Sequence, residues 1–413
     1  MNDVFDATII GAGPAGSTTA ALLRQNGWSV RVLERTRFPR FVIGESLLPR
    51  CMDTLEAAGT LAAVERKGYI VKRGATFLQD GERCTYDFSE QFTRGWSWTW
   101  QVPRASFDDV LASEARRVGA DLHFEAEVTA VDVGDEPVVV WRDANGREQR
   151  TRTSFVVDAS GYGRVLPRLL ALDAPSRLQE RAAVFTHVDG DRRPAGDEAG
   201  RIWVVIHEDA AWIWVIPFHD GRTSIGVVAT PDFLARYPSD GEQCLRAVID
   251  GAPGVRERLA DMQVVMPPQR IQGYSCRVTQ MHGPGYCMVG NATEFLDPVF
   301  SSGVTLALES ARLAAGCVDA ELRGDRPDWA RDFEAPMKLG TDVFRTFVEA
   351  WYRGDLPRIF FNAEKAPNIK RMICSVLAGY VWDEENPFVA QHDRKIRQLI
   401  RLLDSGASLP ESR

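Results

Sequence analysis

The stretch DATIIGAGPAGSTTAALLRQNGWSVRVLERT, residues 6–36, decides the fold of this 413-residue chain. Its pattern predicts a strand over 4–10, a turn with the glycine spacing GxGxxG, a helix over 17–25 and a second strand over 30–33. An acidic residue, Glu34, ends the second strand. Strand, glycine turn, helix and strand in this order, with an acid at this distance, are typical of a domain that binds a dinucleotide.

Each glycine of the turn has its own task. Gly11 makes the tight turn, Gly13 lets the backbone approach a pyrophosphate, and Gly16 lets the helix pack against the strand. The N-terminus of the helix then holds the phosphates, and Glu34 is placed to accept hydrogen bonds from ribose hydroxyls. The residues expected to bind the cofactor in this part of the chain are Gly11, Gly13, Ala15, Gly16, Glu34 and Arg35.

Length and composition exclude several classes of protein. A chain of 413 residues is too long for one compact core, so two or three subdomains are expected. The net charge of −8 argues against general nucleic-acid binding. The chain has no apolar run of about eighteen residues, so no membrane span is expected. The opening MNDVFDATIIGAG lacks the basic region of a secretory signal.

The cysteines and histidines point to a reducing compartment and to no metal. The 7 cysteines are odd in number and widely spaced, and no CxxC occurs, which predicts free thiols in the cytoplasm. The 6 histidines show no metal-ligand spacing, so zinc chemistry is not expected.

Two later segments carry a resemblance to known flavoproteins. FVVDASGYGRVL, residues 155–166, reads as a strand that ends at Asp158 and a turn of small residues. YCMVGNATEFLDPVFSSGVTLALESARLAA, residues 286–315, reads as a strand, a loop and a long helix. Together they resemble the landmarks of the FAD-dependent monooxygenase-like superfamily. The resemblance implies FAD as the cofactor, bound with the help of Asp158, and places Asp297 beside the ribityl chain and the flavin ring.

Arg104 adds to this resemblance, and a second dinucleotide-binding turn is not expected. Arg104, in VPRASFDDVLASEA, resembles the arginine before a helix that contacts the flavin, although an exposed charge at a helix start is the alternative. HGPG at 282–285 does not read as a strand-to-helix glycine turn. We therefore expect no separate nicotinamide domain, and reduced flavin has to come from a separate flavin reductase.

Four further segments resemble the signatures of flavin-dependent halogenases, in the order of that family. WIWVIP, residues 212–217, matches WxWxIP, and FVIGESLLPR, residues 41–50, resembles the segment after the second strand. VKRGATF, residues 71–77, resembles the segment with the catalytic lysine, and DPVFSSGV, residues 297–304, resembles the halide-binding turn. The resemblance implies catalytic roles for Lys72, Trp212, Trp214 and Ser302, chloride at the backbone amides of Ser302 and Gly303, and flavin contacts from Glu45, Ser46, Gly303 and Val304.

The residue types agree with these roles, but each has a plainer alternative. A lysine that enters a flavin core from a strand is partly desolvated, which lowers its pKa, whereas Lys72 alone reads as a solvated residue at a strand end. Successive amides at the start of a helix bind an anion, whereas Ser302 could simply cap that helix. Bulky indoles at Trp212 and Trp214 would keep an organic substrate away from the flavin, whereas strand tryptophans usually pack a core.

The implied reaction runs from a flavin C4a-hydroperoxide through hypochlorous acid to Lys72, which presents electrophilic chlorine to an electron-rich ring. Tryptophan halogenases have a glutamate just before the serine of the halide turn, where this chain has Phe300, so a phenol or pyrrole is expected in place of an indole. Asn291 stands where many flavoproteins have aspartate, and its amide can still bond a phosphate or ribityl group. The tail resembles that of halogenases acting on rings tethered to carrier proteins, and Arg394, Lys395, Arg397 and Arg401 could meet an acidic carrier or simply be solvated.

The predicted fold is α/β, with a Rossmann-like FAD-binding domain, an inserted antiparallel-sheet substrate domain and a C-terminal helical subdomain, as in hydroxylase-like flavoproteins. The FAD-binding domain is expected at 1–70, 105–170 and 275–325, the sheet domain at 71–104 and 171–274, and a helical substrate cap at 326–413. The alternatives are a single-component aromatic hydroxylase, a flavin reductase of the isoprenoid type and a non-catalytic flavin-binding protein. Assembly as a homodimer stays open.

Overall fold

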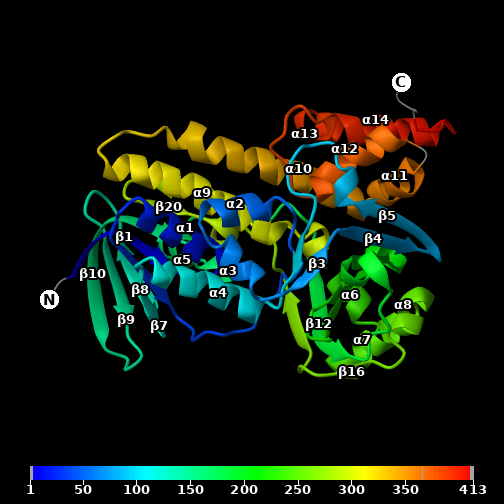
Figure 1. Ribbon diagram of the computed structural model, residues 1–413, viewed down its shortest axis with the longest axis horizontal. Coiled ribbons are helices and arrows are strands. Elements are labelled where there is room, and N and C mark those ends of the chain that lie inside the picture. Colours follow the sequence, from blue (N-terminus) through cyan, green and yellow to red (C-terminus); the bar gives the residue numbers. More distant parts are fainter. Residues whose placement is uncertain (1–2, 365, 410–413) are drawn as a thin grey trace.

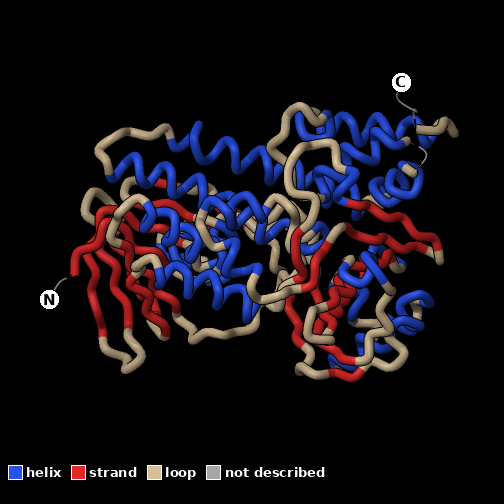
Figure 2. Tube along the Cα trace, viewed as in Figure 1, coloured by secondary structure: helices blue, strands red, loops and turns tan. Residues whose placement is uncertain are grey.

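The computed structural model describes residues 3–364 and 366–409 and has two large sheets joined by helices (Figure 1). Figure 2 shows the strands gathered in two groups, one at each end of the longest axis. The predicted α/β class, with a nucleotide-binding sheet, an inserted sheet and C-terminal helices, is confirmed. None of the described helices is both long and apolar enough to cross a membrane.

The first sheet has a parallel centre, as the glycine turn predicts. Its order is β19-β20-β10-β1-β2-β7, and β20, β10, β1, β2 and β7 run parallel. β8 and β9 extend it through an antiparallel pair beside β10. The strands are β1 (Asp3–Ile10), β2 (Val30–Glu34), β7 (Asp121–Phe124), β8 (Glu127–Asp132), β9 (Val138–Arg142), β10 (Glu148–Asp158), β19 (His282–Gly283) and β20 (Tyr286–Met288).

Both faces of this sheet are covered, which explains its apolar strands. Ile9 and Val157 pack into the core shared with the helices, while Ile10 and Val156 pack into a separate core with β8 and β9. The covering helices are α1 (Pro14–Gln25), α4 (Arg104–Arg117) and α9 (Ser302–Leu322). α1 starts three residues before the predicted 17, because Pro14 has the fixed φ that suits a first helical position.

The second sheet is antiparallel apart from the parallel pair β13–β4. Its order is β16-β12-β15-β14-β13-β4-β5, with β17 beside β12. The strands are β4 (Gly74–Gln79), β5 (Glu82–Asp87), β12 (Ala182–Asp189), β13 (Ile202–Ile206), β14 (Trp212–Pro217), β15 (Thr223–Ala229), β16 (Gln263–Val264) and β17 (Gln269–Gln272).

The two faces of β14 bury different residues, as a strand period of two requires. Trp212, Trp214 and Ile216 face the large core shared with the first sheet and the C-terminal helices. Ile213 and Val215 face a smaller core. That smaller core is closed by α6 (Pro231–Leu234), α7 (Gly241–Asp250) and α8 (Pro253–Arg258).

The C-terminal helices lie along α9 and over β4 and β5 (Figure 1). Phe360 packs on Phe77 with ring centroids 4.7 Å apart, so these helices share the large core and are not a detached layer. They are α10 (Ala335–Tyr352), α11 (Asp355–Ala363), α12 (Pro367–Leu377), α13 (Pro387–Ala390) and α14 (His392–Asp404), after a π-helical turn at Ala330–Glu334.

Short elements connect the two large sheets. β3 pairs with β6, and β11 pairs with β18. They are β3 (Ile70–Lys72), β6 (Thr99–Gln101), β11 (Asp173–Ala174), β18 (Arg277–Val278), α2 (Cys51–Ala57), α3 (Leu61–Glu65) and α5 (Val165–Leu169). The 3-10 turns are η1 (Phe88–Glu90), η2 (Gly161–Gly163), η3 (Gly196–Gly200), η4 (Glu208–Ala210), η5 (Gly290–Ala292) and η6 (Pro298–Phe300).

Candidate active site

A cavity of about 390 Å³ lies between the two large sheets and collects most of the predicted site residues. Its walls come from the glycine turn, the segment after β2, the turn after β10, β14 and the start of α9. The predicted residues that line it are Gly11, Gly13, Ala15, Glu34, Arg35, Glu45, Ser46, Arg104, Trp212, Trp214, Asn291, Gly303 and Val304. The residues that line it do not include Gly16, Lys72, Asp158, Asp297 and Ser302.

The glycine turn leaves open space where a pyrophosphate is expected. Gly11 has a φ of +97°, and a Cβ there would lie 2.6 Å from the carbonyl oxygen of Ala159, so the fold itself requires glycine. A Cβ on Gly16 would lie 2.0 Å from the carbonyl oxygen of Gly11, so this position also requires glycine. Gly13 differs, since the nearest heavy atom to its Cβ would be a guanidinium nitrogen of Arg40 at 3.7 Å. Gly13 also starts α1 without a side-chain cap, so this cradle fits a dinucleotide such as FAD.

Glu34 is held in the cavity wall by backbone donors. The N–H of Ala12 donates to Oε2 (2.9 Å), and Oε1 accepts from the N–H (3.0 Å) and the hydroxyl (2.6 Å) of Thr36. Its carboxylate is therefore fixed at the end of β2, and a carboxylate has further lone pairs for a ribose hydroxyl.

Arg104 is buried in the wall, so the alternative of an exposed helix-start charge is wrong. Nε and Nη2 pair with both oxygens of Asp108 at 2.8 and 3.1 Å, and Nη1 donates to the carbonyl oxygen of Ile43 at 3.0 Å. Arg104 thereby fixes the loop at Ile43, which also lines the cavity.

Asp158 does not line the cavity, although Ala159 to Gly163 do. Its carboxylate accepts from the N–H of Ser160 (2.8 Å) and of Leu166 (2.6 Å), and the residue is fully buried. Asp158 therefore holds the turn 159–163, whose residues do line the cavity, and its expected direct contact with the cofactor has no support in this geometry.

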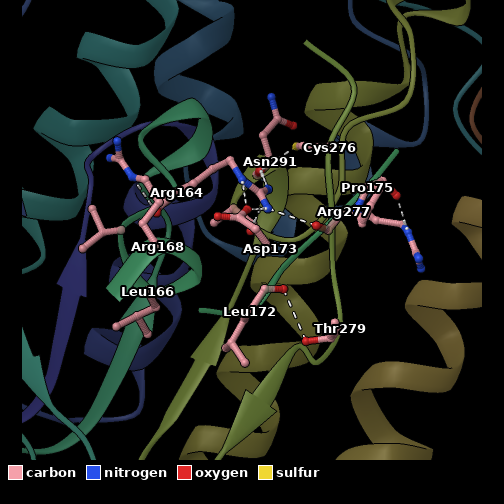
Figure 3. Close-up of polar contacts among 12 residues, drawn as sticks. Arg164, Leu166, Arg168, Leu172, Asp173, Pro175, Cys276, Arg277, Thr279 and Asn291 are labelled. Carbon is pink, nitrogen blue, oxygen red and sulfur yellow. Dashed lines mark hydrogen bonds and ion pairs between the residues drawn. The ribbon is translucent and has the colours of Figure 1, made fainter. Parts of the chain in front are cut away.

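Arg164 fixes the other end of that turn to the segment that carries Asn291 (Figure 3). Its guanidinium donates to the carbonyl oxygens of Asn291 (3.3 Å), Ala292 (3.2 Å) and Arg277 (3.1 Å), and to a carboxylate oxygen of Asp173 (2.9 Å). The backbone of Asn291 is thus held in place at the cavity, which this residue lines.

The two tryptophans of β14 are both buried core residues and part of the cavity wall. Nε1 of Trp212 donates to the hydroxyl of Tyr352 (3.0 Å), and Nε1 of Trp214 donates to Oγ of Ser224 (3.1 Å). A Cβ on Gly226 would lie 2.3 Å from the Trp214 ring, so glycine there makes room for the indole. Core packing and the lining of the cavity are therefore compatible roles.

The predicted halide turn lies at the start of the 21-residue helix α9. Ser301 has a φ of +56° and precedes the first helical residue, Ser302. The helix starts without a side-chain cap, so capping by Ser302 is not observed. A right-handed turn followed by a left-handed residue directs successive N–H groups to one point, which suits an anion.

Lys72 is fully buried, so the alternative of a solvated strand-end lysine is wrong. Its Nζ donates to Oγ of Ser46 and to the carbonyl oxygen of Leu47, each at 2.8 Å, and lies 5.5 Å from the centre of the Phe88 ring. Burial lowers the pKa of Lys72 from its ordinary value to about 7. Because Ser46 lines the cavity, one side chain separates Lys72 from it.

Sequence reasoning missed His187 and Tyr352. Nε2 of His187 lies 3.0 and 3.1 Å from the two carboxylate oxygens of Glu45, and both side chains are buried. The hydroxyl of Tyr352 donates to Oδ2 of Asp297 at 2.8 Å. Neither residue belongs to a motif, since each lies more than fifty positions from its partner, so only the fold reveals them.

Residues 3–364 and 366–409 contain no candidate metal site and no disulfide. They contain no group of three or more histidine, cysteine or acidic side chains placed to hold a metal ion. All seven cysteines are free thiols, as predicted. His282 and Gly283 form a hairpin with β20, so HGPG is not a second dinucleotide turn.

The chain matches the family model of the FAD binding domain over residues 4–332. It is 26% identical to the 1H-pyrrole-2-carbonyl-[peptidyl-carrier protein] chlorinase of Pseudomonas fluorescens, covering 97% of this chain and 94% of that protein. Its structure resembles a flavoprotein/dehydrogenase from Cytophaga hutchinsonii with a TM-score of 0.95 and 44% identity, covering 98% and 100% of the two chains.

A myxobacterial protein, the chondrochloren halogenase CndH, described as a variant of FAD-dependent halogenases, is 33% identical to this chain. Its TM-score is 0.77, and the match covers 85% of this chain and 83% of CndH. The fingerprint, the cavity and these relatives agree: the chain belongs to the FAD binding domain family and, within it, to the flavin-dependent halogenases.

Proposed function

We propose that this protein is an FADH2-dependent halogenase that chlorinates an electron-rich pyrrole or phenol ring, tethered to a carrier protein, in the biosynthesis of a secondary metabolite. The observation that carries the proposal is Lys72. It is a fully buried lysine with two neutral acceptors, placed one side chain from the cavity that fits the flavin. A buried amine with a pKa of about 7 is available as a neutral nucleophile or as a donor under ordinary conditions.

Different residues of the chain have different roles in the proposed reaction. When bound, reduced FAD supplies, with O2, the oxidant that converts chloride into hypochlorous acid. The amides at Ser302 and Gly303 hold the chloride at the start of α9, and Trp212 and Trp214 keep the organic ring out of the flavin cavity. Lys72 then presents electrophilic chlorine to one carbon of the ring, and the buried path limits loss to water.

The proposed partners rest on the nucleotide-binding turn of the described residues and on the relatives of this chain. The described residues contain one GxGxxG turn with its helix, which supports a separate flavin reductase as the source of FADH2. A relative of similar length is named for a pyrrole on a peptidyl carrier protein, which supports a carrier-bound substrate. The side chain of Phe300 packs against Trp351 and offers no carboxylate, which supports a pyrrole or phenol over an indole.

The test compares the wild type with Lys72→Ala, with Lys67→Ala as the control because Lys67 is exposed. Each protein receives FAD, a flavin reductase, NADH, O2, chloride and a pyrrolyl-loaded carrier protein, with phenols in parallel. Mass spectrometry should show chlorinated product from the wild type and Lys67→Ala. Lys72→Ala should bind FAD and release hypochlorous acid but chlorinate nothing.

Other outcomes would overturn the proposal. Hydroxylated product without chlorine, with NADPH consumed in the absence of a reductase, would make the protein an aromatic hydroxylase. Reduction of the bound flavin by an organic substrate without O2 or halide would make it a dehydrogenase, the activity for which the Cytophaga hutchinsonii flavoprotein is named. Bound FAD that never turns over after external reduction would make it a flavin-binding protein.

A further inference from the structure

Tyr352 joins three segments that lie far apart in the sequence. It is the last residue of α10, and its hydroxyl accepts a hydrogen bond from Nε1 of Trp212 in β14 at 3.0 Å. The same hydroxyl donates to Oδ2 of Asp297, the residue before η6, at 2.8 Å. One phenol therefore connects the WxWxIP strand to the segment that leads into the predicted halide turn.

Asp297 uses its carboxylate to shape that turn. Oδ1 accepts from the N–H of Val299 at 3.0 Å, and Oδ2 accepts from the hydroxyls of Tyr274 (3.2 Å) and Tyr352 (2.8 Å). Asp297 is almost fully buried and does not line the cavity, while Pro298 and Ser301 do. Its carboxylate thus fixes the backbone from which the first amides of α9 are directed.

The ring of Tyr352 is itself held in place. The guanidinium carbon of Arg181 lies 3.7 Å from the ring centre, a stacking distance that favours one orientation of the phenol. Trp351, the preceding residue, packs edge-on against Phe300 in the same turn, with centroids 5.8 Å apart. The end of α10 therefore contacts the halide turn through both residues.

We propose that Tyr352 is a positioning residue that sets the halide turn through Asp297 and the Trp212 indole through its own hydroxyl. The C-terminal helices then complete the site that the nucleotide-binding domain and β14 begin. This inference rests on the proposed halide site at Ser302 and Gly303. It adds a residue that does not line the cavity but holds the Trp212 indole and the segment that leads into the halide turn.

Loss of the Tyr352 hydroxyl should weaken halide binding more than FAD binding. A hydrogen bond to a charged group contributes enough that its loss changes a binding constant by about tenfold or more. In Tyr352→Phe the ring keeps its packing, while Asp297 loses one donor and Trp212 loses its acceptor. Halide affinity should fall by about tenfold, whereas FAD affinity should fall much less, because Tyr352 reaches the cavity wall through Trp212 and not through the glycine turn or Arg104.

The test measures halide binding without turnover. Oxidised FAD-loaded protein is titrated with bromide while the flavin absorbance is followed, and crystals of the same proteins soaked in bromide are examined by anomalous diffraction at the turn 301–304. Tyr352→Phe should bind bromide about tenfold more weakly, and Tyr274→Phe, which leaves the Trp212 bond intact, should lose less. Tyr380→Phe is the matched control, because Tyr380 also belongs to the C-terminal region and donates to a backbone carbonyl, that of Trp96.

Double substitution adds a second readout. Trp212→Phe combined with Tyr352→Phe should show less than the sum of the two single losses, because both remove the same hydrogen bond. Bromide bound by Tyr352→Phe with wild-type affinity would overturn the inference, as would a parallel loss of FAD and bromide that marks a merely structural role. Absence of bromide from the turn in the wild type would instead refute the halide site on which the inference rests.

Discussion

Nζ of Lys72 lies 2.8 Å from Oγ of Ser46, and this bond links the buried lysine to a residue in the wall of the cavity between the two large sheets. Ser46 reaches this position because residues 45–47 lie alongside β6, with the N–H of Leu47 donating to the carbonyl oxygen of Trp100 at 3.2 Å. β6 pairs in turn with β3, which carries Lys72. The lysine therefore reaches across one strand to a segment that lines the cavity.

The pH dependence of halogenation should report Lys72. Burial lowers its pKa to about 7, and only the neutral amine is nucleophilic. We expect the ratio of chlorinated product to released hypochlorous acid to rise as the pH increases through about 7 and then to level off. The measurement is product and oxidant yield at fixed flavin supply across that range. A ratio that falls with pH would assign Lys72 the role of a protonated hydrogen-bond donor.

Replacing the buried lysine should stabilise the protein. The pKa of Lys72 is 10.5 in an ordinary setting and about 7 in the fold, so between these values the unfolded chain binds more protons and stability rises with pH. Lys72→Met should therefore be more stable than the wild type near pH 7, and its advantage should shrink by roughly 1.4 kcal/mol per pH unit towards 10.5. Urea unfolding over this range checks it, with Lys67→Met as the exposed control. If the unfolding free energies of the wild type and of Lys72→Met depended on pH in the same way, the lowered pKa of Lys72 would be contradicted.

His187 should be required for the geometry of the Glu45 segment. Its Nε2 is within 3.1 Å of both oxygens of the Glu45 carboxylate. His187→Leu leaves that carboxylate buried without this partner, which typically costs about 3–5 kcal/mol of unfolding free energy. We expect a lower melting temperature and weaker FAD binding, measured by calorimetry and flavin fluorescence. His207→Leu, at the residue that follows β13 and packs edge-on against Phe233, should retain FAD affinity, and equal effects of both changes would argue against a specific role for His187.

Two glycines of one turn should respond differently to the same change. Gly16→Ala places a methyl group 2.0 Å from the carbonyl oxygen of Gly11, so we expect misfolding or a large loss of stability. Gly13→Ala has its nearest protein atom at 3.7 Å, so the fold should persist while FAD affinity falls, because the methyl group enters the expected pyrophosphate space. Circular dichroism reports whether each variant folds, and FAD titration reports its cofactor affinity, so together they distinguish Gly16→Ala from Gly13→Ala. Full FAD affinity in Gly13→Ala would place the pyrophosphate elsewhere.

Trp214 should protect the flavin from the organic substrate. Its indole lines the cavity and packs on Gly226. Trp214→Leu opens that wall, so we expect chlorinated product to fall and hydroxylated product or released hydrogen peroxide to rise, measured by mass spectrometry and a peroxide assay. Ile213→Leu is the control, because Ile213 faces the opposite side of the sheet. An unchanged ratio of chlorinated to hydroxylated product in Trp214→Leu would show that Trp214 serves only to pack the core.

Local pattern predicted much of the nucleotide-binding half. The strand, turn, helix and strand of residues 3–34 appear where the sequence indicates, and Trp212 and Trp214 share one face of β14 as their spacing requires. Asp158 and Asp297 show the limit of motif reasoning. Each sits in a recognisable segment, but hydrogen bonds to nearby N–H groups turn both carboxylates towards the backbone and out of the cavity wall.

The sequence by itself determined the dinucleotide turn, the class of fold and the family, because those signals depend on residues close together along the chain and on steric demands that only glycine meets. Tertiary structure decided the chemistry around them. Glu45 and His187 are 142 positions apart, and Trp212 and Tyr352 are 140 positions apart, so no local pattern marks either pair. The lowered pKa of Lys72 has the same origin, because desolvation depends on which distant segments close over the amine, and only the folded chain brings them together.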